Sequence, residues 1–107
     1  MRGRVTGKDC PMKGLLVNER TIQGRLLVVI CEKELVGKRL SGGYFVDPAY
    51  YQGEPVQLES AMLAARRGDL VTLLGSRVVK AAVARGLVDK DAVTSIGGVS
   101  YAEVYRV

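Results

Sequence analysis

The sequence predicts an α+β fold, a two-layer sandwich in which two main helices pack on one face of a mainly antiparallel sheet. A continuous apolar run with β-branched residues, 26–31, is typical of a central strand buried on both faces. Two helical patterns follow it, at 55–67 and between Ser76 and Gly86. Strand patterns then end the chain at 93–106, so strands flank a helical block, as α+β folds require.

The length and composition indicate one domain, residues 1–107. A chain of 107 residues buries enough surface for one core. Hydrophobic residues make up 48% and charged residues 25%, which is typical of globular proteins rather than disordered ones. The longest apolar run is six residues, and a membrane helix needs about 20. We therefore expect a cytoplasmic protein without a membrane segment, with residues 1–13 as a basic and partly mobile N-terminal segment.

The first half of the chain holds short elements. Residues 14–17 are expected to form a short strand, and the polar residues 18–20 to turn the chain. After the central strand, 32–39 is an exposed charged connection. A short strand at 44–46 and a loop at 48–54 follow.

The first helix is predicted at 55–67. An apolar stripe runs along it at helical spacing: Leu58, Ala61, Met62 and Ala65. Pro55 suits its first turn, and Gly68 can end it.

The rest of the chain continues with residues 69–74, which fit a strand or a helical turn equally well. Ser76 is then expected to be the N-cap of the second helix and Gly86 the residue that ends it. Two glycines, Gly97 and Gly98, favour a tight hairpin between the last two strands.

Catalytic chemistry is scarce in this sequence. The chain contains no histidine, which removes the commonest general base and zinc ligand. The two cysteines, Cys10 and Cys31, form no C-x-x-C motif and are expected to stay reduced, with Cys31 in the core. We therefore predict no catalytic residue, no metal and no cofactor, and the sequence leans against an enzyme. One asparagine, no tryptophan and many charged residues are typical of a heat-adapted organism.

The positive charge is concentrated near the N-terminus. The net charge is +5, of which residues 1–25 carry +4 and the other 82 residues +1. Such an arm can contact nucleic acid phosphates, and the alternative is a solvated basic surface that maintains solubility. The candidate nucleic-acid-binding residues are basic side chains and two loop tyrosines that could stack on bases: Arg2, Arg4, Lys8, Lys13, Lys38, Arg39, Tyr50 and Tyr51.

Five short motifs occur in an order that resembles a known family. They are CEKELVGK at 31–38, YQGE at 51–54, LGSRVV at 74–79, ARGLVD at 84–89 and IGGV at 96–99. Over about residues 25–105 the chain resembles the archaeal domain of unknown function family four-two-four. The resemblance implies an archaeal cytosolic protein with a two-layer sandwich and no established activity. It also favours work linked to RNA or translation, because genes of the family are associated with translation genes.

The chain departs from the family pattern at two places. After IGGV the family reads Pro-His-Ala-Gln, whereas this sequence has Ser100-Tyr101-Ala102-Glu103. Thr72 occupies a position where the family has asparagine. Both departures weaken an enzymatic interpretation.

Three functional hypotheses remain open. The first is a non-catalytic RNA-associated module of the translation machinery, with RNA or ribosome-associated proteins as partners. The second is a protein-interaction or assembly domain whose C-terminal hairpin, 93–106, pairs with a partner or in a homodimer. The third is a small enzyme or ligand binder with a pocket formed by Cys31, Gly37, Thr72, Gly97, Gly98 and Tyr101.

Overall fold

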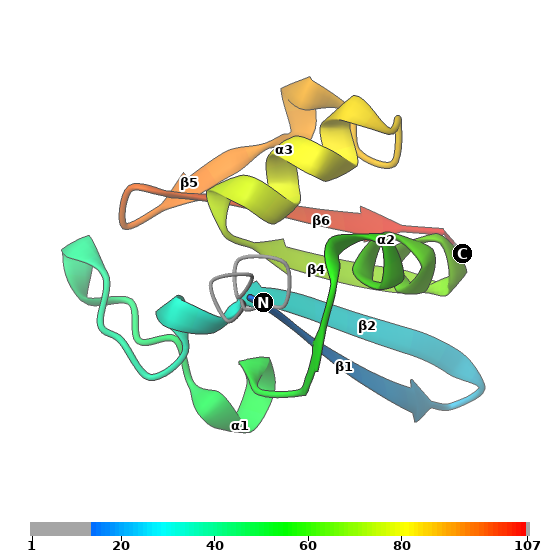
Figure 1. Cartoon of the computed structure of the whole chain (residues 1–107), viewed down its shortest axis with the longest axis horizontal. Helices are drawn as coiled ribbons and strands as arrows, with labels where there is room; N and C mark the ends of the chain where they lie inside the picture. The colour runs from blue at the N-terminus through cyan, green and yellow to red at the C-terminus, as the bar shows by residue number, and fades with distance from the viewer. Residues whose placement is uncertain (1–13, 107) are drawn as a thin grey trace, which may run out of the picture.

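The computed structural model describes residues 14–106, and it is built around a six-stranded sheet of order β3-β1-β2-β4-β6-β5 (Figure 1). The predicted N-terminal segment at 1–13, with Cys10, lies outside the described residues. Only β2 and β4 pair in parallel; the other neighbours are antiparallel. The strands are β1 Leu15–Ile22, β2 Arg25–Glu32, β3 Glu54–Val56, β4 Leu70–Leu74, β5 Thr94–Ile96 and β6 Val99–Tyr105.

The two main helices lie on one face of the sheet, as predicted. They are α2 Leu58–Arg67 and α3 Ser76–Ala84, and a third helix, α1 Pro48–Tyr51, is one turn long. Residues 14–106 also contain three short 3-10 turns: η2 Lys33–Leu35, η3 Ser41–Gly43 and η4 Lys90–Ala92. The predicted α+β class with a mainly antiparallel sheet is therefore confirmed.

The core beneath the helices follows the predicted apolar patterns. Val28 and Ile30 of the central strand face Met62 of α2 and Val78 of α3 in one buried cluster. In the predicted α2 stripe, Ala61, Met62 and Ala65 are buried and Leu58 is half-buried. The stripe packs because residues three and four apart share one helix face.

The opposite face of the sheet has its own cover, which the sequence did not predict. Residues 33–53 cross this face and bury Val46 and Tyr51 against Val29, Cys31 and Leu74. Because both of its faces are covered, β2 is buried on both sides from Leu27 to Cys31, as its continuous apolar run predicted.

Two predictions for the first half of the chain were wrong. Residues 18–20 do not turn the chain; β1 continues to Ile22, and the turn is at Gln23-Gly24, where both φ angles are positive. Polar residues extend the strand because its end is exposed on both faces. The predicted strand at 44–46 is a single bridge between Phe45 and Arg39, and the predicted loop at 48–54 contains α1 and the start of β3.

Two predicted helix starts were also wrong. Pro55 belongs to the edge strand β3, where its missing N–H points away from β1 and costs no ladder bond. Ser76 is the first residue of α3 rather than its N-cap. Its preceding residue, Gly75, has a φ of 131° that favours glycine.

In the second half of the chain, the segment that fitted a strand or a helical turn is a strand, and the predicted hairpin forms. Residues 70–74 form β4 between β2 and β6. The hairpin at Gly97-Gly98 is confirmed, as is the positive φ at Gly86. Gly68 ends α2 as predicted, but its φ is negative. Glycine is required there because a Cβ would overlap Val28 and Val71.

Candidate nucleic-acid interface

A row of side chains crosses four strands on the second face of the sheet, exposed at its two ends and buried or half-buried between them. The strand register places Arg20 opposite Leu27, Leu27 beside Leu70, and Leu70 opposite Tyr105. We call these four residues the open-face row. The Tyr105 side chain is 68% exposed, which leaves its ring available to a ligand.

Two arginines, one in the open-face row and one beside it, make this part of the surface positive. Arg20 donates to the main-chain oxygen of Ala49 at 2.9 Å. Arg25 is exposed beside the hairpin turn and pairs in register with Ile22, which is also exposed. Among residues 14–106, neither arginine lies within ion-pair distance of a carboxylate, whereas Arg67, Arg77 and Arg85 all form ion pairs.

Four tyrosines and Thr72 lie on the covered part of the same face. The Tyr44 and Tyr51 hydroxyls are 2.7 Å apart, and the Tyr50 hydroxyl lies 3.4 Å from Oγ1 of Thr72. The Tyr101 hydroxyl donates to Glu103 at 2.7 Å. Burial, followed by these hydrogen bonds, raises the pKa of Tyr51 and of Tyr101 above the ordinary value, so both remain neutral phenols.

The predicted nucleic-acid-binding residues are distributed unevenly. Arg2, Arg4, Lys8 and Lys13 lie outside the described residues. Lys38 and Arg39 are exposed, and the Arg39 guanidinium lies 5.3 Å from the centre of the Phe45 ring. Tyr51 is only 3% exposed, so its ring has no free face for a base, and Tyr50 is half-buried. Sequence reasoning missed Tyr105, although its alternation with Tyr101 along the predicted last strand was a usable signal.

The predicted pocket residues fall into two groups. Cys31 and Thr72 are fully buried and Tyr101 is half-buried, all on the sheet face that residues 33–53 cover. Gly37 and Gly98 lie in exposed turns, and Gly97 packs against Leu40 and Ser41. The groove between β1 and α2 is lined by none of these six residues.

Burial makes Cys31 a poor nucleophile. Burial raises the pKa of its thiol to about 12, with smaller contributions from the negative charges of Glu32 and Glu34. We expect iodoacetamide at pH 8.5 to leave Cys31 unmodified in the native protein and to modify it after unfolding in urea, as peptide mapping would measure.

The same thiol links stability to pH. Its folded-state pKa is above the unfolded value of about 9, so its contribution is complete below pH 9 and is lost as the pH rises toward 12. The free energy of unfolding should fall by up to about 1.4 kcal/mol per pH unit in this window through this group. The Cys31→Ala variant should show a shallower fall, and an unchanged slope would contradict the assignment.

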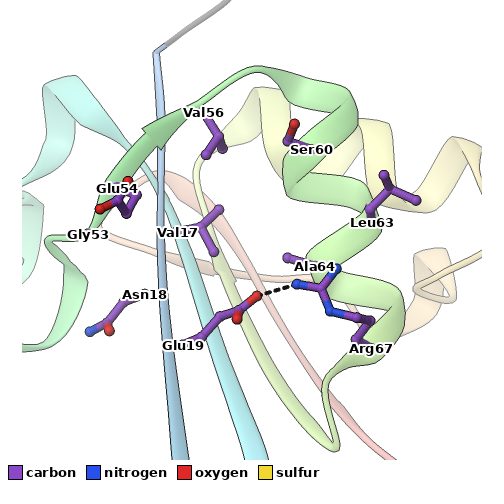
Figure 2. Close-up of a pocket in the computed structure, with 10 residues that line it drawn as sticks. All are labelled: Val17, Asn18, Glu19, Gly53, Glu54, Val56, Ser60, Leu63, Ala64 and Arg67. Carbon is purple, nitrogen blue, oxygen red and sulfur yellow. Dashed lines mark hydrogen bonds and ion pairs between the residues drawn. The ribbon is translucent and has the colours of Figure 1, made fainter.

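A groove lies on the sheet face that carries the main helices, between the edge of the sheet and α2 (Figure 2). Its volume is about 670 Å³. Ten residues from β1, the β3 region and α2 line it: Val17, Asn18, Glu19, Gly53, Glu54, Val56, Ser60, Leu63, Ala64 and Arg67. An ion pair of 2.6 Å between Arg67 and Glu19 bridges the helix and the strand.

Within 14–106, no three cysteine or carboxylate side chains gather closely enough to hold a metal ion. In this part of the chain, no helix combines the length and the apolar character needed to cross a bilayer.

Comparisons with known proteins identify relatives but no activity. The search of curated proteins found no significant match. Among solved structures, the fold is similar to that of an uncharacterized conserved protein from Methanopyrus kandleri, with a TM-score of 0.74 and 19% identity. That match covers 87% of this chain and 91% of the other. The family described as "Protein of unknown function (DUF424)" matches residues 20–107. The chain therefore belongs to the DUF424 family.

Proposed function

We propose that this protein is a non-catalytic module that binds single-stranded RNA, in work linked to translation, through the open-face row and the cations around it. The observation that supports this most is the exposed Tyr105 ring, which lies in one row across the sheet with Arg20. Single strands bind such surfaces because bases stack on aromatic rings while cations contact the phosphates.

The charge distribution supports the same surface. Arg20 and Arg25 have no ion-pair partner among residues 14–106, so they keep their full charge for a polyanion. The chain as a whole carries a net charge of +5, and four of its cations precede the described residues. Cations around a stacking surface are typical of binding that tolerates many sequences.

The test is fluorescence anisotropy with a labelled single-stranded RNA of about ten nucleotides, measured across a salt series. We expect Tyr105→Ala to weaken binding about tenfold, since one stacked base contributes roughly 1–3 kcal/mol. Arg25→Gln should reduce the slope of log affinity against log salt by about 0.7, the value for one phosphate contact on a single strand.

Matched variants on the helix layer serve as controls. Leu63→Ala removes an exposed apolar side chain from α2, and Lys80→Gln removes an exposed cation from α3. Both should leave affinity and salt slope unchanged. Equal losses from Leu63→Ala and Tyr105→Ala, or no binding at low salt, would rule the proposal out.

A further inference from the structure

The edge of β1 is only partly used within the described residues. β3 pairs with β1 at three positions, and along β1 the pairing ends where Val17 lies opposite Glu54, the first residue of β3. The chain crosses from one face of the sheet to the other at Gly53, so close to β1 that a Cβ there would overlap the Val17 carbonyl. β1 itself continues for five residues, to Ile22. Its outer edge beyond Val17 is therefore unpaired within residues 14–106.

The register shows which main-chain groups this edge offers. Ile22 and Arg25 close a two-residue hairpin, so they form a hydrogen-bonded pair, and even-numbered residues of β1 bond to β2. The main-chain N–H and C=O groups of the odd-numbered residues point away from β2, and β3 bonds to those groups of Leu15 and Val17. The N–H and C=O groups of Glu19 and Thr21 remain, and no main-chain partner among residues 14–106 bonds to them.

The groove in Figure 2 lies directly beside these free groups. Its apolar wall comes from Val17 and Val56 on the strands and from Ala64 and Leu63 on α2, of which Leu63 is 58% exposed. Its charged rim is unbalanced: Arg67 pairs with Glu19, whereas the exposed Glu54 has no ion-pair partner among residues 14–106. The groove therefore carries a net negative charge.

We propose that this edge and groove bind an extended segment of another protein, which adds to β1 as an antiparallel strand in line with β3. This mode of binding supplies affinity through main-chain hydrogen bonds and specificity through alternate side chains. It shares only Arg20 with the open-face row, and it does not rest on RNA binding.

The surroundings define the side chains that the segment should carry. The residue opposite Glu19 faces α2, and a lysine there can lay its stem along Leu63 and Ala64 and place its ammonium near Glu54. The residue before it is opposite Arg20 on the other face, where an acidic side chain makes a favourable cross-strand pair. The next residue toward the N-terminus of the segment is opposite Thr21 and favours a β-branched side chain. The segment therefore reads Thr-Glu-Lys from N to C.

A second copy of this chain fits the edge poorly. A symmetric β1–β1 pairing that uses both Glu19 and Thr21 centres on Arg20. It places Arg20 opposite Arg20 of the other copy, and like charges in that position are destabilising. The charge of the groove and of the strand therefore favours a different chain.

The experiment uses the full chain and synthetic peptides of five residues centred on Thr-Glu-Lys. Fluorescence anisotropy should detect binding, and amide hydrogen exchange should slow at Glu19 and Thr21. A peptide with the order Thr-Lys-Glu has the same composition and should bind at least about five times more weakly. Methylation of the lysine main-chain nitrogen, which removes a donor to Glu19, should also cost about fivefold.

Two protein variants test the site from the other side. Thr21→Pro removes one outward N–H and should weaken binding about fivefold. Glu54→Lys changes an exposed side chain and should reverse the preference between the two peptides. The control is Glu103→Pro, which removes an outward N–H from the edge of β6 that has no strand partner within residues 14–106.

The results that would overturn the proposal are equally specific. They are the absence of binding, equal binding of Thr-Glu-Lys and Thr-Lys-Glu, and protection at Glu103 and Tyr105 in place of Glu19 and Thr21. A concentration-dependent dimer that Thr21→Pro abolishes would make a second copy the occupant and would also overturn it. Loss of RNA binding in Tyr105→Ala, with peptide binding intact, would separate the two surfaces.

Discussion

Replacing Glu32 with alanine is expected to lower the free energy of unfolding by about 3 kcal/mol. This carboxylate is only 6% exposed, at the end of β2. Its Oε2 accepts from the main-chain N–H groups of Arg77, at 2.5 Å, and Val78, at 3.1 Å. These amides open α3 and have no partner inside the helix. In Glu32→Ala one buried and one part-buried N–H lose their acceptor, and the favourable interaction with the helix dipole is lost too. Urea unfolding would measure the loss.

Two variants isolate the capping role. Glu32→Gln keeps the shape and one acceptor oxygen, so it should lose about half as much stability as Glu32→Ala. Glu34→Ala removes the exposed partner of Arg77 and should cost less than about 1 kcal/mol. Similar losses in Glu32→Ala and Glu34→Ala would mean that the surface ion pair, rather than the cap, stabilises this end of α3.

Alanine at Gly97 is expected to destabilise the protein by about 3 kcal/mol, and alanine at Gly98 by about 1 kcal/mol. Both glycines have positive φ angles, 59° and 83°, so both substitutions strain the turn. A Cβ at Gly97 would also overlap Leu40 and the main chain of Ser41, whereas a Cβ at Gly98 meets open space. The difference between the two midpoints of urea unfolding therefore measures the contact between the hairpin and residues 40–41.

This comparison also reports on how residues 33–53 are held against the sheet. Gly97→Ala should speed amide exchange at Gly43, whose N–H bonds to the carbonyl of Leu40. Gly98→Ala should leave that exchange rate unchanged. Equal destabilisation by the two substitutions would show that turn strain alone accounts for both effects.

Some elements could be read from a short window of sequence. The run around Val29 predicted the central strand because every residue of a strand buried on both faces must be apolar. The stripe that includes Ala61 and Met62 predicted α2 in the same way, since helical spacing places those residues on one face. The Gly97-Gly98 hairpin followed from the positive φ angles that its turn requires.

Other elements depended on neighbours that are distant in the sequence. Residues 18–20 are polar and were predicted as a turn, but they form a strand because β2 pairs along their whole length. Glu32 was predicted to be exposed, but α3 begins directly beside it and buries it. Residues 33–53 contain no clear period, so their packing on the second face of the sheet could not be predicted.

The candidate sites divide in the same way. The sequence indicated a basic protein with few catalytic residues, and it drew attention to Tyr50 and Tyr51 because they are adjacent in a loop. Only the structure showed that Tyr51 is buried and that Tyr105 is the most exposed aromatic side chain of residues 14–106. It also brought Arg20, Leu70 and Tyr105 into one row. That row crosses four strands, of which β1, β4 and β6 are far apart along the chain.

The sequence by itself determined the fold class, the central strand, the apolar stripe of α2 and the last hairpin, because each depends on residues within a few positions of one another. Within residues 14–106, the tertiary structure decided which polar side chains are buried, which aromatic ring is most exposed and which strand edges are unpaired. Those properties depend on how much of a side chain or main-chain group other segments cover, and the covering segments lie tens of residues away.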